Sequence, residues 1–186
     1  MLDATASTTE NPPPPTLAPW FLFARGVGPK PDRVPTGPDE ALWRLVAGGR
    51  GDWRQALPHP APAGEAPLHP HAPDTAIEVW TERDLSAIHA ASRLLARSPD
   101  EALHARVESA VAWHLAYTEP DNATGRPWAA HVFAARSIVL RDAGARLYAE
   151  HLLHACQVLE ARPDALSAEI LRDAAETLRA ASAARA

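Results

Sequence analysis

The side chains best suited to chemistry gather in one stretch of the chain, from residue 113 to residue 131. Two histidines flank a loop rich in carboxylate, amide and hydroxyl groups. A histidine removed from water and held beside a carboxylate can act as a general acid or base, because its pKa is near neutral. The stretch therefore predicts a cleft that binds a ligand or moves a proton. Its candidate residues are His114, Glu119, Asp121, Asn122, Arg126, Trp128 and His131.

The same residues also have a purely structural explanation. Asp, Asn, Thr and Pro are the residues that tight loops and helix N-termini require. His114 falls in the apolar stripe of its helix, and an unpaired buried polar group costs about 1–3 kcal/mol. We therefore expect His114 to have a partner among Tyr117, Glu119, Asp121 and His131. We also expect His114→Ala to destabilise the fold.

Two further patterns involve metal or thiol chemistry. His151 and His154 lie on one helix face, but two imidazoles are fewer than the three or four ligands that zinc takes. We expect them to be buried hydrogen-bonding groups, and we predict neither a metal nor a cofactor. Cys156 is the only cysteine, which excludes an intrachain disulfide and predicts a packed thiol. The chain has no glycine-rich nucleotide loop, Walker loop or nucleophile elbow.

Charge and hydropathy narrow the class of partner. The formal net charge is −5 and the basic residues form no run, so we expect no nucleic-acid partner. The longest apolar stretch near the N-terminus, at 17–24, is shorter than the roughly 20 residues that a membrane span needs. The first residues also lack the pattern of a secretory signal. We expect a soluble cytoplasmic protein.

The distribution of proline predicts how the chain is organised. Fifteen of the 19 prolines precede residue 75, and proline breaks helix interiors because it lacks a backbone donor. We expect a disordered tail over 1–16 and a proline-rich wrapping segment over 17–80 with one short helix at about 38–47. A helical domain should follow over 81–186.

Apolar residues recur with the helical period after residue 80. This pattern predicts helices over 81–97, 99–118, 127–161 and 163–184, with N-caps at Thr81 and Ser98. The third helix should break at 141–144, because its apolar face rotates there and Gly144 is a weak helix former. The predicted fold class is all-α. It is an amphipathic helical bundle or α/α-hairpin array of about five helices, with an irregular proline-rich N-terminal third.

Residues 17–23, with the sequence LAPWFLF, are too apolar to leave in water. We expect this segment to dock on the helical core like a strap. The alternative is an exposed peptide that binds a partner.

The loop Thr118–Trp128, with the sequence TEPDNATGRPW, resembles the hairpin turns of α/α-toroid proteins. The likeness rests on loop chemistry, and the helical region is too short for a complete toroid. The resemblance implies no activity and no site residue for this chain.

Two functions remain open from the sequence. The first is a non-catalytic helical module that binds a protein partner or forms a homo-oligomer. It rests on the apolar anchors Trp20, Phe21 and Phe23 and on the lack of a complete catalytic set. The second is a small enzyme or ligand-binding protein that uses the cleft between the helices predicted at 99–118 and 127–161. Convergence of the candidate polar side chains around an open pocket would favour the second.

Overall fold

The computed structural model of the chain describes residues 18–57, 64–119, 124–158 and 164–183. Within these ranges the chain forms helices joined by turns and loops, and no strand. The all-α prediction is confirmed. The described helices are α1 (Pro19–Ala24), α2 (Pro38–Val46), α3 (Trp53–Ala56), α4 (Ile77–Arg97), α5 (Glu101–Tyr117), α7 (Ala130–Leu140), α8 (Ala143–Val158) and α9 (Ala165–Ala183).

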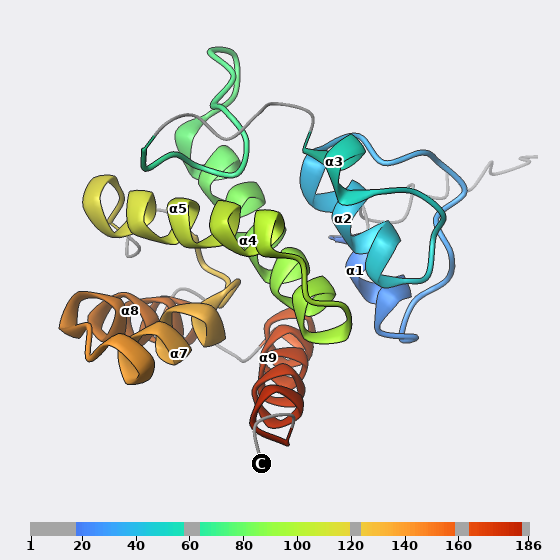
Figure 1. The fold of residues 1–186 in the computed structure, drawn as a ribbon. Coiled ribbons are helices and arrows are strands. Elements are labelled where there is room, and N and C mark those ends of the chain that lie inside the picture. The colour runs from blue at the N-terminus through green and yellow to red at the C-terminus, as the bar shows by residue number, and fades with distance from the viewer. Residues whose placement is uncertain (1–17, 58–63, 120–123, 159–163, 184–186) are drawn as a thin grey trace, which may run out of the picture.

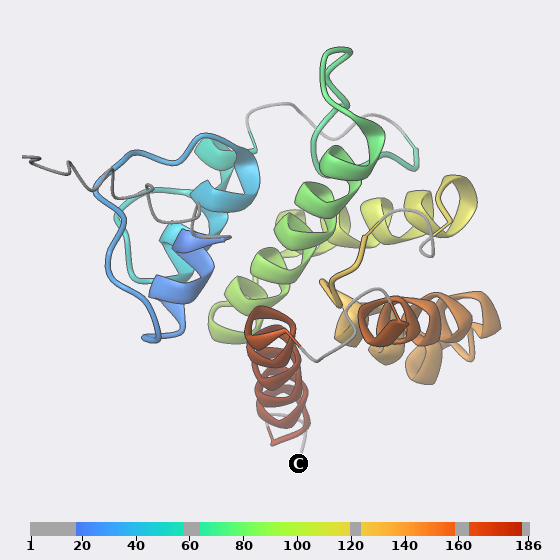
Figure 2. The ribbon, with the colours of Figure 1, turned by 180° about the vertical axis from the view of Figure 1, so that it is seen from behind.

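The long helix α4 is the centre of the molecule. Figures 1 and 2 show α1, α2 and α3 together on one side of α4, and α5, α7 and α8 on the other side. Helix α9 packs against both α4 and α7. Because α4 contacts α2, α5, α7 and α9, its buried face supplies partners to most of the fold. None of the helices within the described ranges is both long and apolar enough to cross a membrane.

The N-terminal third is more helical than predicted. It contains α1, α2 and α3 before α4 begins, whereas the sequence predicted only the helix that corresponds to α2. The extra helices are short, with four to six residues, and prolines lie at their ends or between them rather than inside them. The expected total of about five helices is therefore too low. The expected disordered tail over 1–16 lies outside the described residues.

The apolar segment that begins this third docks on the core, as predicted. Trp20 and Phe21 of α1 are 4% and 0% exposed. The Phe21 ring meets Trp43 of α2 and Trp128 of the loop before α7, at centroid distances of 4.8 and 5.0 Å. The edge-on geometry of both pairs is the favoured arrangement of aromatic rings. Burial of α1 contradicts the alternative of an exposed peptide.

Both predicted N-caps are wrong. Helix α4 begins at Ile77, so Thr81 lies inside it and is buried. Helix α5 is capped by Asp100 rather than Ser98, because the Asp100 carboxylate accepts from the backbone N–H of Leu103 at 2.9 Å. An aspartate can cap a helix as well as a serine can, so sequence alone does not separate neighbouring cap residues.

The predicted break in the third long helix is confirmed, but glycine is not its cause. Arg141 adopts a left-handed backbone conformation with φ 54°, which ends α7. The Asp142 carboxylate then accepts from the backbone N–H of Ala145 at 3.0 Å and starts α8. Gly144 lies within α8. The break folds α7 and α8 against each other as a helical pair.

Candidate functional site

His114 is completely buried, and both of its ring nitrogens have partners. Its Nε2 lies 2.8 Å from Asp84 Oδ2 on α4, and its Nδ1 lies 3.0 Å from Thr118 Oγ1. The Tyr148 hydroxyl of α8 joins the same group, 2.7 Å from Thr118 Oγ1. Since both nitrogens are bonded within the protein and the ring is 0% exposed, His114 presents no free nitrogen to a ligand from solvent.

Asp84 is the anion at the centre of this cluster. It is fully buried and accepts from the backbone N–H groups of Leu68 and His69, at 3.4 and 3.2 Å. Burial alone would raise the pKa of Asp84, but the His114 and His69 rings favour the charged form and lower the pKa to about 2. The cluster therefore joins α4, α5 and the loop before α4 around one buried carboxylate.

Three of the four partners that the sequence proposed for His114 are wrong. Tyr117 is 68% exposed, and Glu119 is exposed too. His131 binds elsewhere on α4, and Asp121 lies outside the described residues. The actual partner, Asp84, is thirty residues earlier in the chain. The sequence does contain a clue to Asp84, because this carboxylate directly precedes the apolar stripe of Leu85 and Ile88. A charge buried at that position must have a partner.

A second buried pair joins α4 to α9, and the sequence analysis did not single it out. His89 Nε2 lies 3.0 Å from Asp173 Oδ2, and His89 Nδ1 accepts from the backbone N–H of Ala129 at 3.4 Å. Both residues are 0% exposed. Arg25, just after α1, donates to Asp173 at 2.9 Å and to Glu169 at 2.7 Å. Like His114, His89 has no free ring nitrogen, so this pair is also structural.

Two more predicted residues bind one carboxylate on α4. The Trp128 indole N–H donates to Glu82 Oε1 at 3.4 Å, and Arg126 Nε lies 3.5 Å from the same oxygen. Arg126 also pairs with Asp164, just before α9. Trp128 is buried at 2% exposure. These contacts attach the loop before α7 to α4 and α9. The remaining candidate, Asn122, lies outside the described residues.

His131 differs from the other two buried histidines. Its Nε2 lies 3.1 Å from Ser92 Oγ on α4, but its buried Nδ1 has no hydrogen-bond partner within the described chain. Burial, followed by the nearby His89 and Arg93, lowers the pKa of His131 well below its usual value, so the ring is neutral at pH 7. Asp84 and Ser92 are eight residues apart, about 12 Å along the axis of α4. His114 and His131 therefore bind α4 at separate positions.

His131 borders a cavity of about 430 Å³ between α5 and α7, which α4 and α9 also line. This volume lies within the range of roughly 300–1,000 Å³ typical of small-molecule sites. Most of the wall is aliphatic, and its polar residues are Ser92, His104, Glu108, His131, Arg136 and Thr177. On the wall, Arg136 pairs with Glu108 at 2.5 Å, so their charges compensate. The aliphatic lining consists of Leu95, Ala96, Val107, Val132, Ala135, Val139, Leu140 and Leu178.

The weak metal candidates lie apart from this cavity. On α8, His154 is exposed and His151 is partly exposed, so the expectation that both are buried hydrogen-bonding groups is wrong. No group of three or more His, Cys, Asp or Glu residues suited to a metal ion was found in the described parts of the chain. Cys156 is buried, as predicted.

Comparisons with family models, with curated proteins and with solved structures find nothing that matches this chain.

Proposed function

We propose that the protein binds a small, largely apolar molecule in the cavity between α5 and α7. One observation carries this proposal: an aliphatic cavity of ligand size borders the one buried histidine that keeps a ring nitrogen without a partner among the described residues. The other two buried histidines, His89 and His114, are fully bonded. The cavity lies between α5 and α7, within the helix ranges that the sequence predicted at 99–118 and 127–161. Among the described members of the predicted residue set, only His131 lines it.

The lining indicates the chemistry of the ligand. Apolar surface removed from water contributes about 25 cal/mol per Å², so the aliphatic wall favours a hydrocarbon body. His131 is neutral at pH 7, and Arg136 is neutralised by Glu108 and Asp142. The wall beside Ser92 and His131 therefore favours an uncharged ligand group that donates or accepts a hydrogen bond, such as a hydroxyl.

The geometry supports binding rather than nucleophilic catalysis. Ser92 and His131 are close enough to form a nucleophile and base, at 3.1 Å. Such a pair needs a third group that orients the imidazole through its other nitrogen. Nδ1 of His131 has no such acceptor within the described chain, whereas Nε2 of His89 has Asp173.

Titration with the neutral fluorescent probe N-phenyl-1-naphthylamine tests the proposal. We expect saturable binding with a blue-shifted emission, and loss of that binding in Ala135→Trp, which fills the cavity. Ala102→Trp places the same side chain on an exposed position of α5 and is the matched control. Binding that survives Ala135→Trp, or is absent from the wild type, would refute the proposal.

A second candidate function is self-assembly, which the exposed end of α7 favours. Ile138, Val139 and Leu140 are 79%, 59% and 57% exposed, and adjacent exposed apolar side chains are typical of contact surfaces. The occupant we propose is a second copy of this chain. Size-exclusion chromatography with light scattering should show a dimer that Ile138→Glu dissociates. A monomer at high concentration would remove this candidate.

A further inference from the structure

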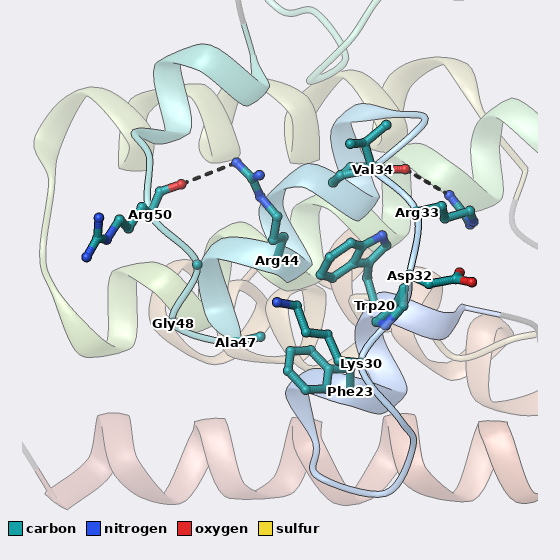
Figure 3. A pocket seen from close by; sticks show the side chains of 13 residues that line it. Trp20, Phe23, Lys30, Asp32, Arg33, Val34, Arg44, Ala47, Gly48 and Arg50 are labelled. Carbon is teal, nitrogen blue, oxygen red and sulfur yellow. Dashed lines mark hydrogen bonds between the residues drawn. The ribbon is translucent and has the colours of Figure 1, made fainter.

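A second cavity lies on the opposite side of α4, in the N-terminal third. It has a volume of about 660 Å³ and lies between α1, the loop over residues 30–35 and the turn that follows α2. Figure 3 shows its side chains: Trp20 and Phe23 of α1 lie beside Lys30 and Arg44. The chemistry of this lining is the opposite of that of the α5–α7 cavity, because basic and aromatic groups replace the aliphatic wall.

Three of the four basic residues of this cavity have no ion-pair partner within the described chain. Lys30, Arg44 and Arg50 line it, and none of them lies within ion-pair distance of a carboxylate in the described chain. Arg33 also lines it, but Arg33 pairs with Glu40 at 2.7 Å. Only one acidic residue contributes to the wall. Uncompensated positive charge at one cavity is notable in a chain whose net charge is −5.

Two buried N–H groups on the cavity-lining side chains also lack acceptors. Trp20 Nε1 and Arg44 Nε are both buried and have no hydrogen-bond partner within the described residues. A buried donor without an acceptor costs about 1–3 kcal/mol. A ligand oxygen that reached either group would supply the missing acceptor. Unpaired charge and unsatisfied donors thus both favour an oxygen-rich anion.

The turn after α2 holds Arg44 in place. A side chain at Gly49 would put its Cβ 2.7 Å from the Arg44 backbone oxygen and 2.9 Å from Arg44 Cγ, so only glycine allows this approach. The guanidinium of Arg44 also donates to the backbone oxygen of Arg50 at 3.2 Å, as Figure 3 shows. A cation positioned in this way loses less freedom when it binds an anion.

We propose that this cavity binds a small organic anion that carries a flat apolar group. The anionic oxygens would lie against Lys30 and Arg44, and the apolar group would lie against the rings of Trp20 and Phe23, which contact each other edge-on at 6.2 Å. Carboxylate and phosphate share the required chemistry. This site is independent of the α5–α7 cavity, so either proposal can fail without the other.

Isothermal titration calorimetry with four small probes tests the inference. Phenyl phosphate and benzoate carry both the anion and the ring, inorganic phosphate carries only the anion, and benzyl alcohol carries only the ring. We expect one or both of the first two to bind, and their relative affinity separates a phosphate site from a carboxylate site. Absence of binding by both at about 10 mM would overturn the proposal. Equal affinity for inorganic phosphate would overturn the role of the aromatic wall.

Two charge-removing variants locate the site. Lys30→Gln changes an exposed side chain and should leave the fold intact, as circular dichroism can verify. We expect Lys30→Gln and Arg44→Gln each to weaken the binding of the better probe about tenfold, the loss of one charged contact. Arg146→Gln removes the same charge from an exposed position on α8 and is the matched control. Unchanged affinity in Lys30→Gln would contradict the proposal even if Arg44→Gln does not fold.

Discussion

His114 and His131 are both buried against α4, yet they differ in their hydrogen bonding and in what they pack against. His114 uses both ring nitrogens, one on the Asp84 carboxylate at 2.8 Å and one on the Thr118 hydroxyl at 3.0 Å. His131 uses one nitrogen on Ser92 at 3.1 Å and keeps the other unbonded within the described chain. His114 packs beside other protein groups, whereas His131 borders an aliphatic cavity.

This difference separates a structural histidine from a candidate binding histidine. A satisfied polar cluster stabilises a fold because every buried group has a partner. An unsatisfied group costs free energy unless a ligand or water supplies the partner, so its presence beside a cavity is informative. The comparison predicts that the Asp84 and His114 cluster controls stability, and that Ser92 and His131 control binding.

The largest effect should come from removing Asp84. Asp84→Ala leaves His114 and two backbone N–H groups without their acceptor, and each buried donor left unsatisfied costs about 1–3 kcal/mol, so we expect a loss of about 3–5 kcal/mol. Urea unfolding followed by circular dichroism measures the loss. Asp74→Ala, at an exposed position in the preceding loop, should change the free energy of unfolding by less than about 0.5 kcal/mol. If Asp84→Ala lost no more stability than the control, the Asp84 and His114 cluster would not control the stability of the fold.

The next largest effect should come from replacing His114 with phenylalanine, compared with the same replacement of His131. His114→Phe removes both hydrogen bonds and leaves the Asp84 charge short of a partner, which should cost roughly 2–3 kcal/mol. His131→Phe loses one hydrogen bond to a neutral hydroxyl, and we expect a loss within about 1 kcal/mol. Urea unfolding of the two variants side by side checks the order. The reverse order would contradict the comparison.

Acid should then destabilise the fold in two separate ranges of pH, one set by His131 and His89 and the other set by Asp84. The pKa values of His131 and His89 are lowered in the folded chain, so the unfolded chain binds more protons below pH 6.5, and stability falls with pH there. Each ring can contribute up to about 2 kcal/mol of loss by pH 5. The pKa of Asp84 is lowered to about 2, so its contribution is lost only as the pH falls below about 4.

Unfolding measured at pH 7, 6 and 5 tests this separation. In His131→Phe the decline between pH 6.5 and 5 should become shallower, because one group no longer takes up a proton on unfolding. An identical slope in the variant and the wild type would mean that His131 is not held neutral by burial.

The smallest effect on stability should come from Ser92. Ser92→Ala should change the free energy of unfolding by about 1 kcal/mol or less, because it removes one neutral hydrogen bond. It should nevertheless weaken the binding of 1-naphthol by about three- to tenfold and leave naphthalene unaffected, since only the former has a hydroxyl. Fluorescence titration measures both affinities. Equal losses for both molecules would show that Ser92 shapes the cavity without bonding to the ligand.

Local patterns in the sequence predicted much of the helical part of the fold. The helical period identified α4, α5 and α9, and the rotated apolar face placed the break near Arg141. These features depend on residues within one or two turns of each other. Helix α1 was predicted only as a docked segment, because six residues are too few to show a period.

The candidate site depended on contacts between distant parts of the chain, so the sequence predicted less of it. The burial of His114 was predicted correctly from its apolar stripe, but its partner Asp84 comes from another helix. The α5–α7 cavity is lined by four helices, and Ser92, His131 and Thr177 come to its wall from three of them. No local pattern brings these three together. The loop residues Asp121 and Asn122 remain untested, since they lie outside the described residues.

Nitrogen NMR of the histidine side chains during titration with 1-naphthol tests the central claim most directly, because it reports on both rings in one sample. We expect the 1-naphthol to bind beside His131, so that the ring signals of His131 shift progressively to saturation while those of His114 stay in place. A shift of the His114 signals, or saturation of the protein with probe while His131 stays unchanged, would contradict it.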